Sequence, residues 1–209
     1  MTTDIVGSDA RQRVMDTAET LFMQRGYSAI TLRDIAEELG IRQASLYYHF
    51  PEGKEQIYVA VVERAFERHR VGMEAAIDAA GPDLAGQLRA IAQWFETQPR
   101  MNLSSIMHAD MSALNDANAR HLGRVAYACL FEPLHHAFIA SNRRGDTRPV
   151  NPNVLAGTFL SVIDGLAFTT HSKGAPIRAE MVDEVISVLL DGLRSPHGHR
   201  NHDCIDKSK

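Results

Sequence analysis

The stretch TLRDIAEELGIRQASLYYHFPEGKEQIY, residues 31–58, predicts two short helices around a glycine turn and a third helix that begins at a lysine. Thr31 can cap the first helix because its hydroxyl can accept a hydrogen bond from a free backbone N–H, and Asp34 can return a bond from three residues on. Gly40 follows this helix, where a left-handed C-terminal residue is best tolerated. A tight helix pair can place one helix end in a DNA groove, so the stretch predicts a helix-turn-helix.

The second short helix divides into a buried side and an exposed side. Leu46 and Phe50 are four residues apart and are expected to point inward, and Ile41 is expected to fill the space between the two helices. The other residues of this helix are left to face solvent or a ligand: Arg42, Gln43, Ser45, Tyr47, Tyr48 and His49.

A further helix precedes this pair. Ser8 or Asp9 can cap it, and Gly26 ends it. Its apolar stripe consists of Val14, Ala18, Leu21 and Phe22. Residues 9–50 therefore predict a three-helix unit. At about forty residues its own core is thin, so we expect it to pack against the rest of the chain.

Several groups of residues along this unit resemble, in order, the motifs of the TetR/AcrR family of bacterial transcriptional regulators. The resemblance covers roughly residues 11–58 and is carried by Ala18, Leu21, Phe22, Gly26 and Tyr27, by Thr31, Ile35, Ala36 and Gly40, by Leu46, Tyr47, His49 and Phe50, and by Lys54 and Glu55. The chain also departs from the family pattern. Arg42 stands where the family often has a serine cap, and one extra residue, Glu52 or Gly53, precedes Lys54.

The resemblance implies an all-α fold with an N-terminal three-helix helix-turn-helix domain, followed by a helical domain for ligand binding and dimerisation. We assign residues 9–55 to the DNA-binding domain and 56–195 to the second domain, and we expect residues 196–209 to form a disordered tail. The implied function is that of a repressor, which a small apolar or amphipathic ligand releases from a palindromic operator. Its partners would be double-stranded operator DNA, a small-molecule inducer and a second copy of the chain.

Side-chain chemistry distributes the expected contacts to DNA. Gln43 suits adenine and Arg42 suits guanine, so these two residues are the expected readers of base edges. Ala44 belongs to the same opening turn of the helix and is included in the interface. Phosphate contacts are expected through the helix starts at Thr31 and Lys54, and from the side chains of Ser45, Tyr47, Tyr48 and His49.

Charge limits how the chain can bind DNA. The chain carries 22 basic and 26 acidic residues, a formal net charge of −4, so there is no overall attraction to phosphate. Residues 1–54 also hold more acidic than basic side chains. Binding must therefore rest on locally placed base contacts and backbone N–H groups, which argues against a basic architectural protein.

The remaining composition predicts a soluble, cytoplasmic protein without a cofactor. With 209 residues, 44% of them hydrophobic, the chain can bury a core in one or two domains. Its N-terminus carries no signal pattern, and no apolar run reaches the roughly 18 residues that a membrane span needs. The two cysteines, Cys129 and Cys204, are too few and too far apart for a disulfide framework.

Past Phe50 the hydrophobic periodicity predicts helices throughout. A long helix begins at Lys54 and fades before Gly81, and further helices are expected over residues 84–99, 106–114, 118–142, 153–171 and 179–194. Pro133 is expected to kink the helix in which it lies, because proline removes one backbone donor.

Apolar residues go nearly all round the last two predicted helices, which indicates burial on more than one side. One interpretation is that both are central helices of a monomer core. We favour a second interpretation, in which they cover their own core on one side and a second subunit on the other. The resemblance implies the same arrangement, a four-helix bundle across a two-fold axis. The residues expected at this interface are Phe159, Val162, Ile163, Leu166, Val185 and Leu189.

The middle helices are the expected place for the inducer, because pockets in helical bundles combine an apolar wall with a few polar groups. The alternative is that most of these residues are ordinary core and that the histidine is solvated. The residues expected to line the pocket are Trp94, Phe95, Met107, His108, Met111, Tyr127 and Phe131.

Three other functional interpretations remain as alternatives. A metal-sensing regulator could use the tail donors His197, His199, His202 and Cys204, although their spacing matches no zinc-finger template and we expect no metal site. An enzyme is more remote, because the motifs G-x-S-x-G and H-E-x-x-H are missing from the sequence. A helical interaction module would offer no reason for the sequence of the second short helix.

Overall fold

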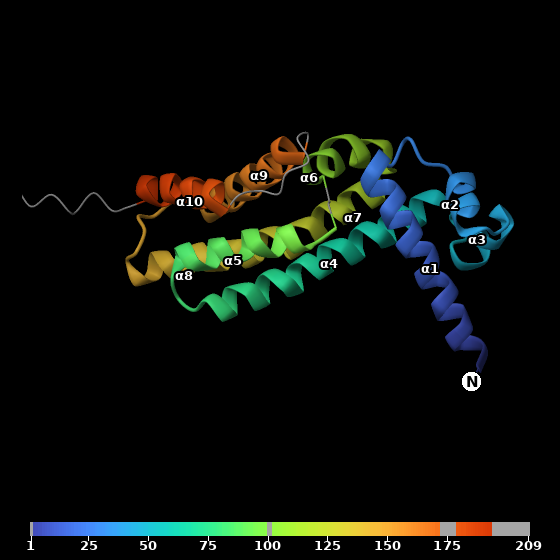
Figure 1. Cartoon of the computed structure of the whole chain (residues 1–209), viewed down its shortest axis with the longest axis horizontal. Helices are drawn as coiled ribbons and strands as arrows, with labels where there is room; N and C mark the ends of the chain where they lie inside the picture. Colours follow the sequence, from blue (N-terminus) through green and yellow to red (C-terminus); the bar gives the residue numbers. More distant parts are fainter. Residues whose placement is uncertain (1, 100–101, 172–178, 194–209) are drawn as a thin grey trace, which may run out of the picture.

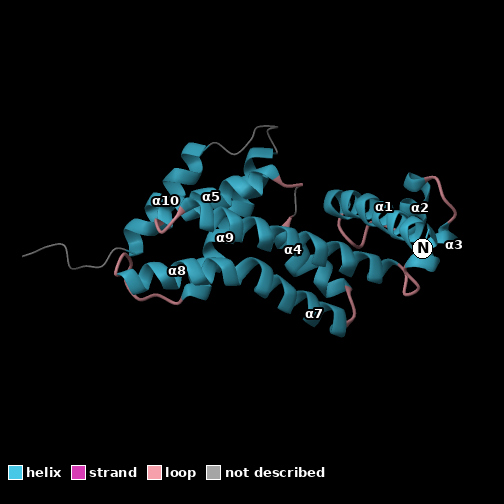
Figure 2. Cartoon of the chain, turned by 90° about the horizontal axis from the view of Figure 1, so that it is seen from below, coloured by secondary structure: helices cyan, strands magenta, loops and turns pink. Residues whose placement is uncertain are grey.

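The computed structural model describes residues 2–99, 102–171 and 179–193, and within residues 2–8 and 167–171 it describes the backbone alone. Every regular element in these ranges is a helix, as the periodicity predicts (Figures 1 and 2). At one end of an elongated molecule lie α1 (Thr2–Arg25), α2 (Leu32–Leu39) and α3 (Gln43–His49), which we call the reading end. The long helix α4 (Lys54–Ala80) leads from this end into the remaining helices.

The first helix starts earlier than its sequence predicts. Ser8 and Asp9 do not cap it, because α1 already begins at Thr2 and runs through both positions. In a helix interior, serine and aspartate are less favourable than alanine by only about 0.7 kcal/mol or less. Because residues 2–25 also contain no proline, the helix can continue through Ser8 and Asp9. The other end agrees with the prediction, since Gly26 follows α1 with a φ of 77°.

The turn between α2 and α3 follows its sequence closely. The amide of Asp34 donates to the hydroxyl of Thr31 at 3.2 Å, and the amide of Thr31 donates to the carboxylate of Asp34 at 2.7 Å, which completes the expected capping box. Gly40 ends α2 in the left-handed conformation, with φ at 67°. The amide of Ile41 then donates to the carbonyl of Ala36 at 3.0 Å, and this bond turns the chain toward α3.

Ile41 does not fill the space between the two helices as expected. Its side chain is 40% exposed, because the turn uses its backbone N–H and directs the side chain outward. The core under this turn comes instead from Ile35, Leu46 and Phe50, each at most 1% exposed. Leu46 and Phe50 therefore point inward, as their spacing predicts.

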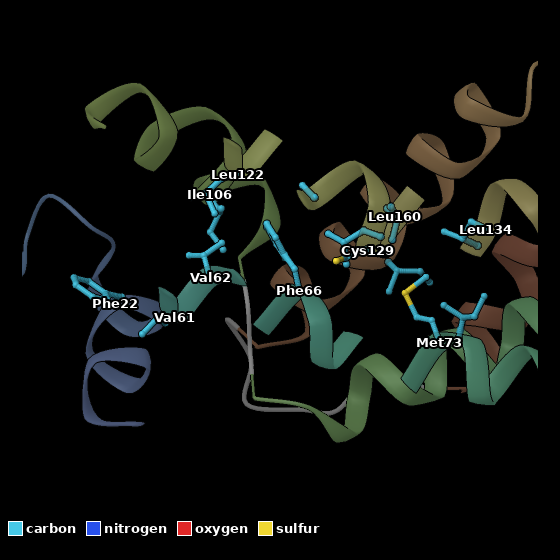
Figure 3. Close-up of a cluster of buried hydrophobic side chains, with 14 of the residues drawn as sticks. Phe22, Val61, Val62, Phe66, Met73, Ile106, Leu122, Cys129, Leu134 and Leu160 are labelled. Carbon is cyan, nitrogen blue, oxygen red and sulfur yellow. The ribbon is translucent and has the colours of Figure 1, made fainter. Parts of the chain in front are cut away.

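The apolar face of α4 runs through a core that the reading end and the rest of the molecule share. Val61, Val62, Phe66 and Met73 are all 0% exposed. Figure 3 shows these side chains along α4, between Phe22 of the reading end and side chains of the later helices. Burying one such side chain contributes roughly 1.5–3 kcal/mol to the free energy of folding. The N-terminal unit is therefore stabilised by packing against the rest of the chain, as its thin core predicts.

The later helices surround α4. They are α5 (Leu84–Thr97), α6 (Leu103–Ser105), the π-helical turn η1 (Ile106–Asp110), the 3-10 turn η2 (Met111–Ala113), α7 (Asp116–Ala126), the π-helical turn η3 (Tyr127–Phe131), α8 (Glu132–Arg144), α9 (Pro152–His171) and α10 (Ala179–Leu193). Along its length α4 packs against α5, α7, η3 and α8. No helix in the described ranges is long and apolar enough to cross a membrane.

The helix expected over residues 118–142 is interrupted where proline was expected to act. It divides into α7, the wider turn η3 and α8, and Pro133 lies in the first turn of α8. A proline ring cannot donate to the carbonyl four residues back, and a π-helical turn just before it accommodates the loss. Gly145 ends α8 with φ at 84°.

Candidate functional site

The exposed face of α3 carries the residues expected to contact DNA. Tyr47 is 46% exposed and Tyr48 is 82% exposed, while Leu46, on the inner side of the helix, is 1% exposed. Beneath the helix, the guanidinium of Arg11 lies 4.8 Å from the centre of the Phe50 ring. Gln43, Ala44 and Ser45 are exposed at the start of the helix, Arg42 is exposed just before it, and His49 is half-buried near its end.

Arg42 is the residue at the N-terminal boundary of α3, and its side chain makes no capping hydrogen bond. The free N–H groups of the first turn of α3 are therefore not covered by a side chain of the kind that serine supplies at this position. An uncapped helix start is a ready site for a phosphate oxygen. Arg42 thus leaves both its guanidinium and the helix start available to DNA.

The side chain of Thr31 is held by Asp34, whereas the contact to phosphate was predicted through the helix start. The Thr31 hydroxyl donates to Asp34 at 2.6 Å, and the Thr31 amide donates to the same carboxylate. These bonds lower the pKa of Asp34 below its usual range, which keeps the carboxylate charged. A phosphate at this helix start would therefore meet the amides of the first turn of α2 rather than the side chain of Thr31.

The extra residue before Lys54 has a structural explanation. Gly53 precedes α4 with φ at 78°, a conformation that favours glycine, and a Cβ at this position would lie 3.5 Å from the Tyr47 ring. Lys54 is turned onto the ring of Tyr27, with its ammonium 3.9 Å from the ring centre. Burial lowers the pKa of Lys54. The Lys54 side chain is thus held at the junction with α1, and the amides at the start of α4 are its remaining means of meeting phosphate.

A buried carboxylate joins the reading end to the rest of the molecule. Asp110 is 6% exposed; it accepts a hydrogen bond from the Tyr27 amide at 3.0 Å and another from the Tyr58 hydroxyl at 2.9 Å. Burial and the nearby carboxylate raise the pKa of Tyr58 far above its usual value, so the phenol keeps its proton. Asp110 was not predicted from the sequence, although an acidic residue inside the apolar segment IMHADM could have drawn attention to it.

Ion pairs hold α1 on α4. Arg64 contacts Asp16 at 2.7 Å and Glu19 at 2.5 Å, and Arg68 contacts Glu19 at 2.7 Å. Because Glu19 is only 8% exposed, its two charge-assisted bonds, to Arg64 and Arg68, are less screened than surface pairs. They fix the axis of α1, and with it the unit that presents α3, against the long helix.

Trp94 and Phe95, expected to line the inducer pocket, pack around a histidine of α4 that was not predicted from the sequence. The His69 ring stacks on Phe95 with centroids 4.7 Å apart and meets Trp94 edge-on at 6.5 Å. His69 is 1% exposed, and burial lowers its pKa to about 4, so it is neutral near pH 7. Its place in the stripe Phe66, His69, Met73 was the available sequence signal.

This aromatic group leaves polar atoms unsatisfied. Both ring nitrogens of His69 and the indole N–H of Trp94 are buried without a hydrogen-bond partner among the described residues. Most buried polar groups in proteins do have a partner, so each exception calls for a reason. One neutral imidazole and one indole N–H could together bind a carbonyl or hydroxyl group of a ligand.

The other residues expected at the pocket lie on η1, η2 and η3. Met107 and Met111 are half-buried against the core on η1 and η2, and His108 is exposed, with Nδ1 3.0 Å from the carbonyl of Ser104. Tyr127 is 40% exposed; its hydroxyl donates to Asn153 of α9, and its ring stacks on Phe131. Met107, Met111 and Phe131 pack against the same core as Trp94 and Phe95, and the pocket that these residues were expected to line stays a prediction.

The residues expected at the dimer interface fall into two groups. Phe159 and Ile163 are 1% and 3% exposed and belong to the core of the chain itself, because α9 turns this side toward η3 and α8. They are therefore reassigned from the expected interface to the core. Val162, Leu166, Val185 and Leu189 are half-buried. Strongly exposed apolar side chains on the same two helices are Val154 and Val188.

The tail residues considered as metal ligands, His197, His199, His202 and Cys204, lie outside the described residues. Within the part of the chain that the structure describes, no cluster of three or more histidine, cysteine, aspartate or glutamate side chains could hold a metal ion. The geometry therefore supplies no argument for the metal-sensing alternative.

Comparison with known proteins agrees with this geometry. The family described as bacterial regulatory proteins, tetR family, matches residues 14–61, from α1 into the first part of α4. The HTH-type transcriptional repressor KstR2 of Rhodococcus jostii (strain RHA1) is 31% identical over 193 residues. That alignment covers 91% of this chain and 94% of KstR2, so it extends far beyond the helix-turn-helix.

Two solved structures share the fold. A transcriptional regulator from Saccharomonospora viridis in complex with choline has a TM-score of 0.69 at 22% identity, over 88% of this chain and 96% of that one. AibR in complex with isovaleryl coenzyme A and operator DNA has a TM-score of 0.69 at 19% identity, over 86% of this chain and 97% of that one. These identities bear on the fold alone, whereas the alignment with KstR2 bears on the family. The expected resemblance and the expected all-α fold are confirmed, and the chain belongs to the TetR family of bacterial regulatory proteins.

Proposed function

We propose that this chain is a DNA-binding transcriptional repressor that a small molecule releases from its operator. One observation carries the proposal: α3 buries Leu46 and exposes Gln43, Ser45, Tyr47 and Tyr48 on its other side. A helix built in this way can enter a major groove while its inner face stays packed. KstR2 is named as a transcriptional repressor, and the similarity to it supports repression rather than activation.

We assign the contacts to DNA by the chemistry of the exposed groups. Gln43 and Arg42 read base edges, and Ser45, Tyr47, Tyr48 and His49 meet phosphate, with Ala44 against the groove. The amides at the starts of α2 and α4, beside Thr31 and Lys54, add phosphate contacts without a side-chain charge. The domains divide accordingly, with residues 9–55 for DNA binding and residues 56–195 for the ligand and the second subunit.

We infer that the protein acts as a homodimer through α9 and α10. Each of these helices carries an exposed valine, Val154 at 59% and Val188 at 70%, beside half-buried apolar residues. A two-fold contact would place two copies of α3 on a palindromic operator. Two reading ends that bind one operator together would also supply affinity for DNA. A chain with a net charge of −4 cannot gain that affinity from general attraction to phosphate.

We propose that the inducer binds beside Trp94 and Phe95 of the expected lining and beside His69. This site offers an apolar aromatic wall and unpaired polar nitrogens, so it suits an apolar or amphipathic molecule with one carbonyl or hydroxyl group. The structures with choline and with isovaleryl coenzyme A support a fold that accommodates effectors, since those two relatives bind these molecules.

Selection of DNA fragments from a random pool by the full-length protein tests the proposal. The retained fragments should share one sequence with two-fold symmetry, with half-sites about one helical turn apart or a multiple of it. Gel-shift titration of that sequence, against a scrambled one of equal length and composition, then measures the specificity. A pool that stays random after repeated rounds would contradict the proposal.

The single tryptophan of the chain makes the inducer site directly observable. A compound that binds beside Trp94 should change the tryptophan fluorescence and release the selected DNA over the same concentration range. The compounds to screen are apolar and amphipathic molecules with one carbonyl or hydroxyl group. Release without a fluorescence change would place the inducer elsewhere, while leaving the DNA-binding function intact.

A further inference from the structure

The segment of residues 103–113, made of α6, η1 and η2, is held at its first turn by a carboxylate from α9. Asp164 accepts hydrogen bonds from the amides of Leu103 and Ser104, both at 3.2 Å, and from the Ser104 hydroxyl at 2.9 Å. Asn102 adds a local cap by accepting from the Ser105 amide at 2.8 Å. The start of the segment is therefore tied to one of the two helices to which we assign dimerisation.

The other end of the segment is held to the reading end. Asp110, the last residue of η1, accepts from the Tyr27 amide just beyond α1 and from the Tyr58 hydroxyl of α4. Its burial makes these bonds costly to break, because a charged group would be left without partners. A Cβ at Gly26 would lie 3.4 Å from the carboxylate, so the chain also passes close to Asp110.

A third contact lies just beyond the segment. Glu55, in the first turn of α4, accepts from the amide of Asn115 at 2.9 Å and from the side-chain amides of Asn115 and Asn118. The segment and the residues after it thus meet the reading end and the start of α4 at two places. Figure 1 shows α6 between the end of α9 and the end of α1, which is the arrangement that these hydrogen bonds require.

The segment is not close-packed along its whole length. Ser105, Ile106 and Asp110 border a cavity of about 230 Å³ that they share with the end of α1, from Phe22 to Gly26. The middle of the segment is the π-helical turn η1, a rare conformation that occurs mostly as single turns and frequently at functional sites. Because hydrogen bonds hold both ends, a displacement of α9 can reach Tyr27 through the helical turns of the segment, and the cavity leaves room for the segment to shift.

We propose that Asp164 and Asp110 are positioning residues for operator recognition. Through residues 103–113 they set where the reading end lies relative to α9, and hence relative to the two-fold axis of the dimer. The inference rests on the proposed function, because it assigns α9 to the dimer and α3 to DNA. It predicts that loosening either carboxylate relaxes the spacing between the two half-sites that the dimer accepts.

Amide hydrogen exchange of the full-length protein tests the mechanical part of this proposal without DNA. Asp164→Ala should speed the exchange of the Tyr27 amide about fivefold, because loss of the first tie loosens the contact at the other end. Asp83→Ala is the matched control, since Asp83 caps the start of α5 by accepting from the Gly86 amide at 2.8 Å. This control should leave the exchange of Tyr27 unchanged.

Faster exchange confined to residues 103–106 in Asp164→Ala would overturn the proposal, as would equal effects of Asp164→Ala and Asp83→Ala on Tyr27. Should Asp164→Ala fail to fold, Ser104→Ala removes only the hydroxyl contact and should speed Tyr27 exchange in the same direction. Ser104→Ala without effect on Tyr27 would then count against the coupling.

The role in operator recognition is tested by measuring the affinity for operators whose half-sites are separated by spacers of different length. For the wild type we expect a clear preference for the selected spacer over one that is a base pair longer. Asp110→Asn and Asp164→Ala should reduce this preference about fivefold, while Asp83→Ala keeps it. An unchanged preference in both variants would overturn the role in positioning. Absence of any sequence-specific binding by the wild type would contradict the proposed function instead. The hydrogen-exchange measurement would still test the coupling through residues 103–113.

Discussion

His69 is a single residue whose burial should make the stability of the whole chain depend on pH. Burial lowers its pKa from 6.5 to about 4, so the unfolded chain binds the proton more readily than the folded one. The stability that depends on neutral His69 is therefore present above pH ~6.5 and is lost as the pH falls toward 4, by roughly 2–3 kcal/mol at pH ~4.5. Urea denaturation at pH ~7 and ~4.5 measures this loss. His69→Leu should lose clearly less stability over the same interval, and equal losses would show that another group is responsible.

The close packing of Trp94 on Gly72 gives a second prediction for a single residue. A Cβ at this position would lie 2.0 Å from the Trp94 ring, so the absence of a side chain is what lets α5 approach α4 here. Gly72→Ala should therefore destabilise the fold by about 1–3 kcal/mol and shift the tryptophan emission. Gly123→Ala on α7 is the control, because nothing lies within 4 Å of a Cβ there, and it should stabilise the helix by roughly 0.5–1 kcal/mol. Urea titrations that give both variants the same sign would contradict the packing described for Trp94.

The residues that sequence reasoning found and those that it missed differ in the range of their contacts. The capping box of Thr31 and Asp34 spans three residues, and the inward side of α3 follows from the spacing of Leu46 and Phe50, so both could be predicted. Asp110 and His69 owe their surroundings to partners on other helices, such as Tyr27, which is 83 positions before Asp110. Local patterns cannot place such partners, which is why neither residue was predicted as a functional group.

At the scale of elements, helix boundaries marked by glycine were predicted and irregular turns were not. Gly26 and Gly40 follow helices with positive φ, as expected of glycine at these positions. The π-helical turns η1 and η3 lie inside segments whose sequence reads as ordinary helix. The turn η3 packs against α4 and is followed by Pro133, and a local helical pattern does not contain the contact with α4.

The helices α9 and α10 give a prediction about assembly. Val188→Glu puts a charge on an exposed apolar position of α10, so it should weaken the dimer while leaving each chain folded. Val71→Glu, on an exposed position of α4 at 53%, is the matched control and should leave assembly unchanged. Sedimentation of the wild type at micromolar concentration should give twice 23.2 kDa, and Val188→Glu should shift toward the single mass. A wild type that sediments as a monomer would remove the proposed interface and the palindromic operator together.

At the scale of the whole molecule, the reading end and the later helices share one core and are joined by buried Asp110. Phe22, Val61 and Leu134 belong to the same cluster of buried side chains, which Figure 3 follows along α4. Both α4 and residues 103–113 connect the reading end to the later helices, and the proposed coupling of effector and DNA runs through them. The net charge of −4 has a further consequence, since it leaves little general affinity for phosphate and makes binding depend on the fit of α3.

The central claim is that α3 reads bases, and the measurement that tests it most directly is the affinity for every single-base variant of the selected operator. The wild type should discriminate strongly at a few positions in each half-site. Gln43→Ala should cost about 1–3 kcal/mol on the selected operator and lose discrimination at one base pair per half-site. Tyr48→Phe, which removes one hydroxyl from the same face, should weaken all sequences equally. If Gln43→Ala keeps the wild-type profile at every position, α3 is not the base-reading element and the central claim is wrong.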